Sequence, residues 1–399
     1  MSTMKTFGRL LLIIMPIFLI CCKPSTESSK KAESSELWSV KMANSVMNIH
    51  DSLIYYEGRD RIRWQYDVAM LSMAIDKLGV IDQKYSDYMK TYYDYFINSD
   101  GTVNTYKIEN YNIDNINPAK NLFTLYKRTG EEKYNIAIQG FVKQMENHPK
   151  TQSDGFWHKK VYPYQMWLDG IYMGSPFLAQ YAKEYNKSEW FDVVTHQITL
   201  IYDKTLDPKT KLLYHAWDES KEQKWSNPET GQSPHFWSRA IGWYTMAIVD
   251  VLDYLPENHP DREKIITILN NTIDALLNVS DKETGLWFQV LDQGNRKGNY
   301  IEGSGTCMYI YAMAKAANKG YIKKKYFQIA NKKFDSVIKN LIVTDGNGNL
   351  VLKSVCGGCG LGGNPYRDGS YEYYINEKVV DNDSKGVGPF ILAAIELNR

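Results

Sequence analysis

The strongest constraint on the fold is an alternation between two kinds of helical segment, which begins near residue 36 and continues to the end of the chain. Segments of the first kind carry apolar residues at three- and four-residue spacing beside Lys, Glu, Asn and Gln. This pattern is typical of helices that are wet on one side. We expect six such outer helices, at residues 36–52, 82–98, 131–147, 189–204, 261–279 and 323–341.

Segments of the second kind begin with a polar and aromatic cluster and then become apolar around most of their circumference, so they must be buried. We expect six inner helices, at residues 62–78, 116–128, 165–184, 237–255, 304–319 and 386–397. Six hairpins of one outer and one inner helix predict an all-α fold, the (α/α)6 barrel, because no hairpin could bury its apolar face alone. An open helical solenoid is the alternative, but the apolar last helix favours a closed ring.

A second repeat lies between each outer helix and the next inner one, where a turn leads into a short extended segment. These segments predict short β structure in the rim loops, at residues 154–158, 211–215, 284–288 and 348–352. His158 and His215 hold the same place in successive repeats. We therefore expect both histidines to face one mouth of the barrel.

The N-terminus has the features of an export signal. Lys5 and Arg9 precede or flank an apolar run, residues 10–20, that is too short to span a bilayer, and Cys21-Cys22 resembles a bacterial lipobox. An ordinary cleaved signal peptide is the alternative. We expect three parts: a lipoprotein signal peptide at 1–22 with Cys22 acylated, a flexible tether at 23–35, and a single barrel domain at 36–399.

This organisation predicts an exported protein, a periplasmic or outer-membrane lipoprotein of a bacterium, that meets the membrane only through its lipid anchor. The net charge of +1 supplies no long-range field for nucleic acid. The 30 Tyr and 10 Trp residues suit stacking on sugar faces, although helical proteins also use aromatics as core volume. We expect a monomer or a weak homodimer.

The cysteines beyond the leader give no metal site. Cys307 lies in an apolar helical run and is predicted to be a core residue. Cys356 and Cys359 form one C-x-x-C pair without the second half of a zinc site, so a tight loop is favoured, with a local disulfide after export as an option. No metal-binding motif or cofactor fingerprint occurs in the sequence, and we expect neither a metal nor a cofactor.

Two aspartates are candidates for acid/base chemistry. Asp114 lies just before an inner helix, and Asp169 lies in the first turns of the next one. Carboxylates from adjacent hairpins suit proton transfer at a glycosidic centre. Asp114 could instead cap a helix, whereas Asp169 stands in an apolar helix, where a carboxylate is costly to bury without a task or a partner.

The segment 235–244 opens the fourth inner helix with further candidates. Arg239 could offer its planar fork to a carboxylate, and Trp237 and Trp243 could form walls for a sugar ring. An internal salt bridge with aromatic packing is the alternative for this cluster. His158 and His215 could donate hydrogen bonds to sugar hydroxyls or to a uronate, or could be merely structural.

Several motifs on separate hairpins together resemble glycoside hydrolase family 105, the unsaturated rhamnogalacturonyl hydrolases, from about residue 64 to the C-terminus. They lie at residues 111–115, 165–170, 214–220, 236–244 and 385–390. The resemblance implies an (α/α)6 fold with Asp169 as general acid/base and Asp114 as its assisting carboxylate. It also implies a pocket for the unsaturated uronate lined by Tyr66, His158, Trp167, His215, Arg239 and Trp243, and we add Trp237 as a candidate wall.

The implied activity is removal of a 4,5-unsaturated uronic acid from the non-reducing end of rhamnogalacturonan, pectin-type or ulvan-type oligosaccharides. A protonated Asp169 delivers a proton to C4 of the double bond, water adds at C5, and the hemiketal opens and expels the remaining sugar. This route needs no covalent intermediate, metal or cofactor. Two alternatives are a polysaccharide lyase on the same barrel and a glycan-binding lipoprotein without catalysis.

Overall fold

The computed structural model describes residues 37–399. The predicted signal peptide, the tether and the acylated Cys22 lie outside the described residues and stay predictions. Within the described part, no helix combines the length and the apolar character that a bilayer-spanning segment needs.

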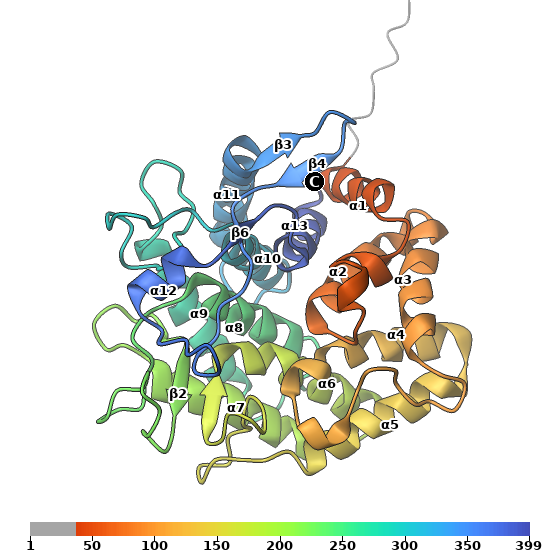
Figure 1. Cartoon of the computed structure of the whole chain (residues 1–399), viewed down its shortest axis with the longest axis horizontal. Coiled ribbons are helices and arrows are strands. Elements are labelled where there is room, and N and C mark those ends of the chain that lie inside the picture. Colours follow the sequence, from red (N-terminus) through yellow and green to blue (C-terminus); the bar gives the residue numbers. More distant parts are fainter. Residues whose placement is uncertain (1–36) are drawn as a thin grey trace, which may run out of the picture. The chain divides into compact units, whose positions relative to one another are not determined.

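The alternation of outer and inner helices is confirmed (Figure 1). The outer helices are α1 (Trp38–Ile49), α3 (Gln83–Phe96), α5 (Glu132–Glu146), α7 (Glu189–Thr205), α9 (Arg262–Asn278) and α11 (Lys325–Leu341). The inner helices are α2 (Tyr66–Asp76), α4 (Lys120–Thr129), α6 (Leu168–Glu184), α8 (Ser238–Val251), α10 (Gly303–Asn318) and α13 (Ser384–Leu397). Each lies within a few residues of its predicted range.

The inner helices close into a ring. Helix α6 packs on α8, α8 on α10, α10 on α13, and α13 on α2, while the 3-10 turn η6 (Asn117–Ala119) before α4 contacts both α2 and α6. Gly388 of α13 permits the close approach to α2, because a Cβ there would lie 3.3 Å from the Cα of Leu71. The contact between the first and the last inner helix excludes the open solenoid and confirms the (α/α)6 barrel.

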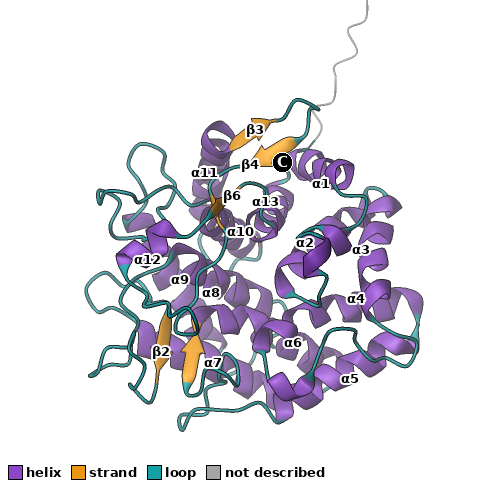
Figure 2. Ribbon diagram, in the orientation of Figure 1, coloured by secondary structure: helices purple, strands orange, loops and turns teal. Residues whose placement is uncertain are grey.

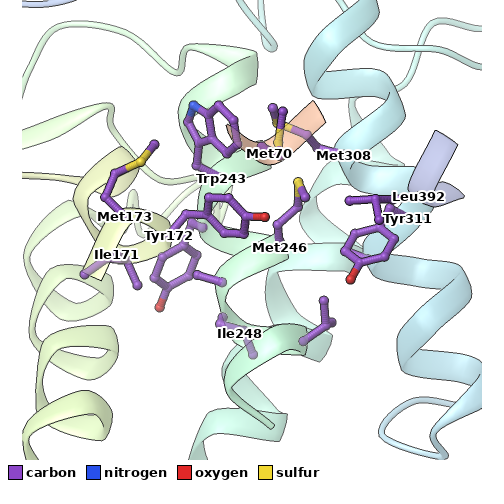
Figure 3. Close-up of a cluster of buried hydrophobic side chains, with 14 of the residues drawn as sticks. Met70, Ile171, Tyr172, Met173, Trp243, Met246, Ile248, Met308, Tyr311 and Leu392 are labelled. Atoms are coloured by element: carbon purple, nitrogen blue, oxygen red, sulfur yellow. The ribbon is translucent and has the colours of Figure 1, made fainter. Parts of the chain in front are cut away.

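The centre of the ring is a packed core. Figure 3 shows side chains from five inner helices meeting there, among them Met70 of α2, Tyr172 of α6, Met246 of α8, Tyr311 of α10 and Leu392 of α13. All five are buried. Interiors of this kind are close-packed, so the barrel is filled at its middle and a ligand can enter only at an end.

The rim turns repeat with one geometry. Lys211 and Gly285 have φ angles of 64° and 71°, and their amides donate to the carbonyls of Asp207 and Asp281 at 2.9 and 2.8 Å. Such left-handed positions end a turn and send the chain into an extended segment. The repeated turn places the segments that follow it at the same end of the barrel as the N-termini of the inner helices.

Three short antiparallel pairs in the described residues confirm that the rim loops contain short β segments (Figure 2). They are β1 (Gln165–Trp167) with β2 (Ala216–Asp218), β3 (Ile342–Thr344) with β4 (Leu350–Leu352), and β5 (Val355–Cys356) with β6 (Val379–Val380). Only one strand, Leu350–Leu352, falls within a predicted range. The ranges 154–158, 211–215 and 284–288 contribute isolated bridges at Phe156, Leu213 and Phe288 instead. The β1–β2 pair joins the rim loops of two successive hairpins, and His158 and His215 flank it.

The remaining elements are short. They are η1 (Leu53–Tyr55), η2 (Arg59–Arg61), η3 (Lys77–Val80), η4 (Ile108–Asn110), η5 (Ile113–Asn115) and α12 (Tyr371–Asn376). Cys307 is fully buried, as predicted for a core residue. Cys356 ends β5 and Cys359 lies in the glycine-rich loop that follows it; both are free thiols with their sulfur atoms 3.4 Å apart, so the optional disulfide is not formed here.

Candidate active site

A cavity of about 1090 Å³ opens at the rim where the inner helices begin. Five of the predicted site residues line it: Tyr66, Asp114, His158, Trp167 and Asp169. The other wall is formed by segments near residues 357–367 and 377–385 of the last hairpin. The cavity therefore collects both candidate carboxylates at one end of the barrel.

Asp169 stands in the first turn of α6 and is 8% exposed. Its Oδ2 atom lies 3.3 Å from Nε2 of His215. Neither atom has a hydrogen-bond partner with good geometry within residues 37–399. Oδ2 is closed off from the cavity by its place against His215, whereas Oδ1 accepts no hydrogen bond from the described residues and is not buried in the same way. Because Asp169 lines the cavity, Oδ1 is available to a ligand that enters it.

His215 lies behind Asp169, is fully buried and does not line the cavity. Its Nδ1 atom is 2.8 Å from the hydroxyl of Tyr374, a residue of α12. When that hydroxyl donates to Nδ1, a neutral imidazole carries its proton on Nε2, which faces Asp169. Tyr374 and His215 can thus orient the carboxyl group of Asp169.

Asp114 lies in η5 and contacts two basic groups. Its carboxylate oxygens are 2.7 Å from Nζ of Lys159 and 3.4 Å from Nε2 of His158. Burial acts to raise the pKa of Asp114, but the adjacent ammonium group of Lys159 outweighs it and holds that pKa below its ordinary value. Asp114 is therefore an anion at neutral pH, engaged with these partners rather than with a helix end.

His158 is buried and stacks on the indole of Trp167, with ring centroids 4.4 Å apart and planes 9° from parallel. Burial lowers the pKa of His158 to about 4. The imidazole is therefore neutral at physiological pH, and it can donate to Asp114 from Nε2.

Arg239, Trp237 and Trp243 lie outside the cavity wall. Arg239 is 1% exposed, donates to the carbonyl of Cys356 and, at 3.2 Å, to Oγ of Ser304, and stacks over the ring of Trp237. No carboxylate within residues 37–399 forms an ion pair with it, so the alternative of an internal salt bridge is wrong. Trp243 packs against Tyr172 in the barrel core, as Figure 3 shows. The substrate-binding roles of these three residues stay predictions.

Several residues of the site were missed from the sequence. Lys159 directly follows His158 in the same rim turn, and that proximity could have revealed it. Tyr162 and Arg367 line the cavity, and Tyr374 supports His215. These three residues lie outside the repeated segments 154–158, 211–215, 284–288 and 348–352, so no repeat pointed to them.

Replacing Arg239 by Lys should raise KM by roughly 10-fold, the effect of losing about one hydrogen bond to a charged group. An ammonium group cannot reproduce the two contacts that the guanidinium makes with Cys356 and Ser304, so the loop behind the cavity should lose its position. Steady-state kinetics together with the melting temperature check this. An unchanged KM would show that Arg239 has no part in substrate binding, direct or indirect.

Acid should destabilise the fold through its buried histidines. Burial lowers the pKa of His148, as of His158, to about 4, against an ordinary value near 6.5. Between pH 6.5 and pH 4 the unfolded chain therefore binds protons that the folded chain does not, and the free energy of unfolding falls as the pH falls. The loss is about 2 kcal/mol per histidine between pH 7 and pH 5.

Urea titrations at pH 7 and pH 5 measure this dependence. The variant His148→Gln should lose about 2 kcal/mol less than the parent protein over the same interval, since the group that takes up the proton is gone. Equal losses in both proteins would contradict a depressed pKa at His148.

Comparisons with known proteins agree with this geometry. The model of the family described as Glycosyl Hydrolase Family 88 matches residues 38–399. The structure resembles a solved C. acetobutylicum ATCC 824 glycoside hydrolase from family 105, with a TM-score of 0.88, 45% identity, and coverage of 91% of this chain and 99% of that chain.

Two curated proteins show further similarity. A protein of Agrobacterium fabrum (strain C58 / ATCC 33970), named Protein Atu3128, is 34% identical over 56% of this chain and 97% of its own length. The unsaturated rhamnogalacturonyl hydrolase YesR of Bacillus subtilis (strain 168) is 25% identical over 66% of this chain and 73% of its own length. The chain therefore belongs to the glycoside hydrolases that the family 88 model describes, and its similarity to the C. acetobutylicum enzyme places it with family 105.

Proposed function

We propose that this glycoside hydrolase removes a 4,5-unsaturated uronic acid from the non-reducing end of oligosaccharides, with Asp169 as the proton donor. One observation carries the proposal. A buried carboxyl group, whose Oδ1 accepts no hydrogen bond from the described part of the chain, faces a roomy cavity beside a second carboxylate that is held as an anion.

The two carboxylates have different surroundings, which is how a site assigns acid and base roles. Asp114 is bound to Lys159 and stays ionised, so the donor role falls to Asp169. The proton goes to C4 of the enol-ether double bond, and positive charge develops at C5 and the ring oxygen. Asp114 stabilises that charge through space, and water adds at C5 and gives up a proton, which returns to the carboxylate of Asp169.

The resulting hemiketal opens to a ketone at C5, which leaves C1 of the uronate as a hemiacetal. The hemiacetal breaks down to an aldehyde and releases the rest of the oligosaccharide with a free hydroxyl as its new non-reducing end. Lys159 and Arg63 line the cavity and supply positive charge for the uronate carboxylate. Neutral His158 can exchange hydrogen bonds with sugar hydroxyls without adding a charge.

The substrate class rests on the relatives. The Bacillus protein is named an unsaturated rhamnogalacturonyl hydrolase, so we favour an oligosaccharide of the pectin type, with the ulvan type as a second option. We also propose that the chain is exported and anchored through Cys22, in the periplasm or at the outer membrane of a bacterium, and that it acts as a monomer or weak homodimer.

The test is a panel of unsaturated disaccharides from pectin, ulvan and glycosaminoglycan digests, followed by the ultraviolet absorbance of the double bond. We expect the absorbance to fall, fastest with the pectin disaccharide. A rise on intact polysaccharide would identify a lyase instead. Binding without any change of absorbance would identify a glycan-binding protein.

A further inference from the structure

The cavity is larger than a site for one sugar ring requires. Its volume of about 1090 Å³ lies just above the range of roughly 300–1,000 Å³ for pockets that hold drug-sized ligands. Asp114, His158 and Asp169 occupy only one part of its wall. The rest of the cavity can therefore receive the sugar that follows the unsaturated uronate.

Trp167 is not available as a wall for that sugar. Its indole is 5% exposed, and three aromatic rings surround it: His158 and Tyr162 stack on it at 4.4 and 5.0 Å, and His215 meets it edge-on at 5.5 Å. Tyr162 lines the cavity and is half-buried, whereas His158 and Trp167, which also line it, are buried. The ring that a sugar can reach is therefore that of Tyr162.

Arg367 stands next to Tyr162 in the same wall. Its Nη2 donates to the hydroxyl of Tyr162 at 2.8 Å, and its Nε donates to the carbonyl of Gly362 at 2.8 Å. A Cβ at Gly360 would collide with the guanidinium of Arg367, and one at Gly363 would crowd it. The glycine-rich loop therefore packs closely around this group. Arg367 is thus held in one position by the loop.

No carboxylate of residues 37–399 lies within ion-pair distance of Arg367, although the wall of the cavity carries several. Its Nη1 donates to no acceptor within residues 37–399, unlike Nε and Nη2. A fixed guanidinium that faces a cavity without a carboxylate partner is suited to a planar or tetrahedral oxyanion. The missing partner can come from the ligand.

We propose that Tyr162 and Arg367 form a subsite for the sugar that follows the unsaturated uronate, in which Tyr162 stacks on the sugar ring and Arg367 binds an oxyanion carried by the oligosaccharide. The oxyanion is a sulfate ester on that sugar or the carboxylate of a further uronate. This inference rests on the proposed function, because the aspartates define which end of the cavity holds the first ring.

The test compares three substrates with the same terminal unsaturated uronate: a neutral disaccharide, the same disaccharide with a sulfate ester on its second sugar, and a tetrasaccharide with a further uronate. Arg367→Met should lower kcat/KM on the order of 10- to 100-fold for whichever charged substrate the site accepts, the effect of losing one charged hydrogen bond. The neutral disaccharide should be affected little. The charged substrate that responds identifies the source of the oxyanion.

Tyr162→Ala should lower kcat/KM more for all three substrates than for the methyl glycoside of the unsaturated uronate, which has no second sugar and therefore reports only the indirect effect of Tyr162 on Trp167. Lys224→Met is the matched control, because Lys224 lies over the neighbouring Tyr366 ring and outside the cavity wall. It removes the same charge and should leave the preference among the substrates unchanged. The loop could unfold in Arg367→Met, and Arg367→Lys is a second variant that tests for this. It keeps the positive charge but lacks the planar guanidinium.

An equal loss for neutral and charged substrates in both Arg367 variants would overturn the proposal and show that Arg367 only supports its loop. No loss for any substrate would overturn it as well. If the parent protein hydrolysed none of the substrates, the proposed function would fail by itself. The subsite would then be judged by calorimetric binding of the same oligosaccharides, where Arg367→Met should still weaken only the charged ones.

Discussion

The variant Asp169→Asn should lower kcat by roughly 10²- to 10⁴-fold, the contribution of a positioned acid/base group. An amide has nearly the shape of the carboxyl group but cannot deliver a proton to C4 of the sugar. The amide oxygen can keep the place of the carboxyl oxygen that lies 3.3 Å from Nε2 of His215, so the change should leave the melting temperature close to that of the parent protein.

Asp218→Asn provides the matched control. Asp218 is a fully buried aspartate of β2, and its carboxylate accepts hydrogen bonds from Ser220 and from the amide of Gln223 outside the cavity wall. We expect this variant to lose stability and to keep its turnover. Near-normal loss of double-bond absorbance in Asp169→Asn would exclude Asp169 as the proton donor.

The helical framework could be predicted because the spacing of apolar residues within each segment indicates whether the helix is inner or outer. Residues 237–255 are apolar around the whole helix and 261–279 on one side only, and they became the inner α8 and the outer α9. Closure of the ring followed from the apolar last helix, α13, which must be covered on all sides. Boundaries differ by a few residues because caps such as Asp383, which accepts from the amide of Lys385, extend the helix beyond its apolar pattern.

The candidate site was only partly predictable. Repeat phase and helix starts pointed to His158, His215, Asp114 and Asp169, which the structure brings to one end of the barrel. The partner of Arg239 could not be found in the sequence, because it is the backbone carbonyl of Cys356 rather than a carboxylate. Every residue has a backbone carbonyl, so no residue type in the sequence marks the one that binds Arg239.

Interactions between loops that are distant in the sequence could not be predicted either. Tyr374 reaches His215 across 159 residues, and Arg367 reaches Tyr162 across 205. Such contacts depend on how irregular segments fold over the barrel mouth, and no periodicity encodes that. Trp167 illustrates the same limit, since its burial among other rings depends on neighbours from separate loops.

The variant Asp114→Asn should lower kcat/KM on the order of 10²-fold, because the anion that stabilises positive charge near C5 is lost. It also leaves Lys159 without its 2.7 Å partner, so part of any loss could reflect a disturbed site. The double variant Asp114→Asn/Lys159→Met separates the two effects. It removes both charges and should recover stability relative to Asp114→Asn, since a lone charge that is largely buried costs more than an absent pair.

Activity should not recover with stability in the double variant, because the charge that acts on the substrate is still missing. In Lys159→Met alone, loss of the cation should raise the pKa of Asp114, so the acid limb of the pH–rate profile should move to higher pH. Lys160→Met, which changes the neighbouring cation outside the cavity wall, should leave that limb in place. Recovery of turnover together with stability would mean that Asp114 only neutralises Lys159, and an unmoved acid limb in Lys159→Met would show that the ion pair does not control the ionisation of Asp114.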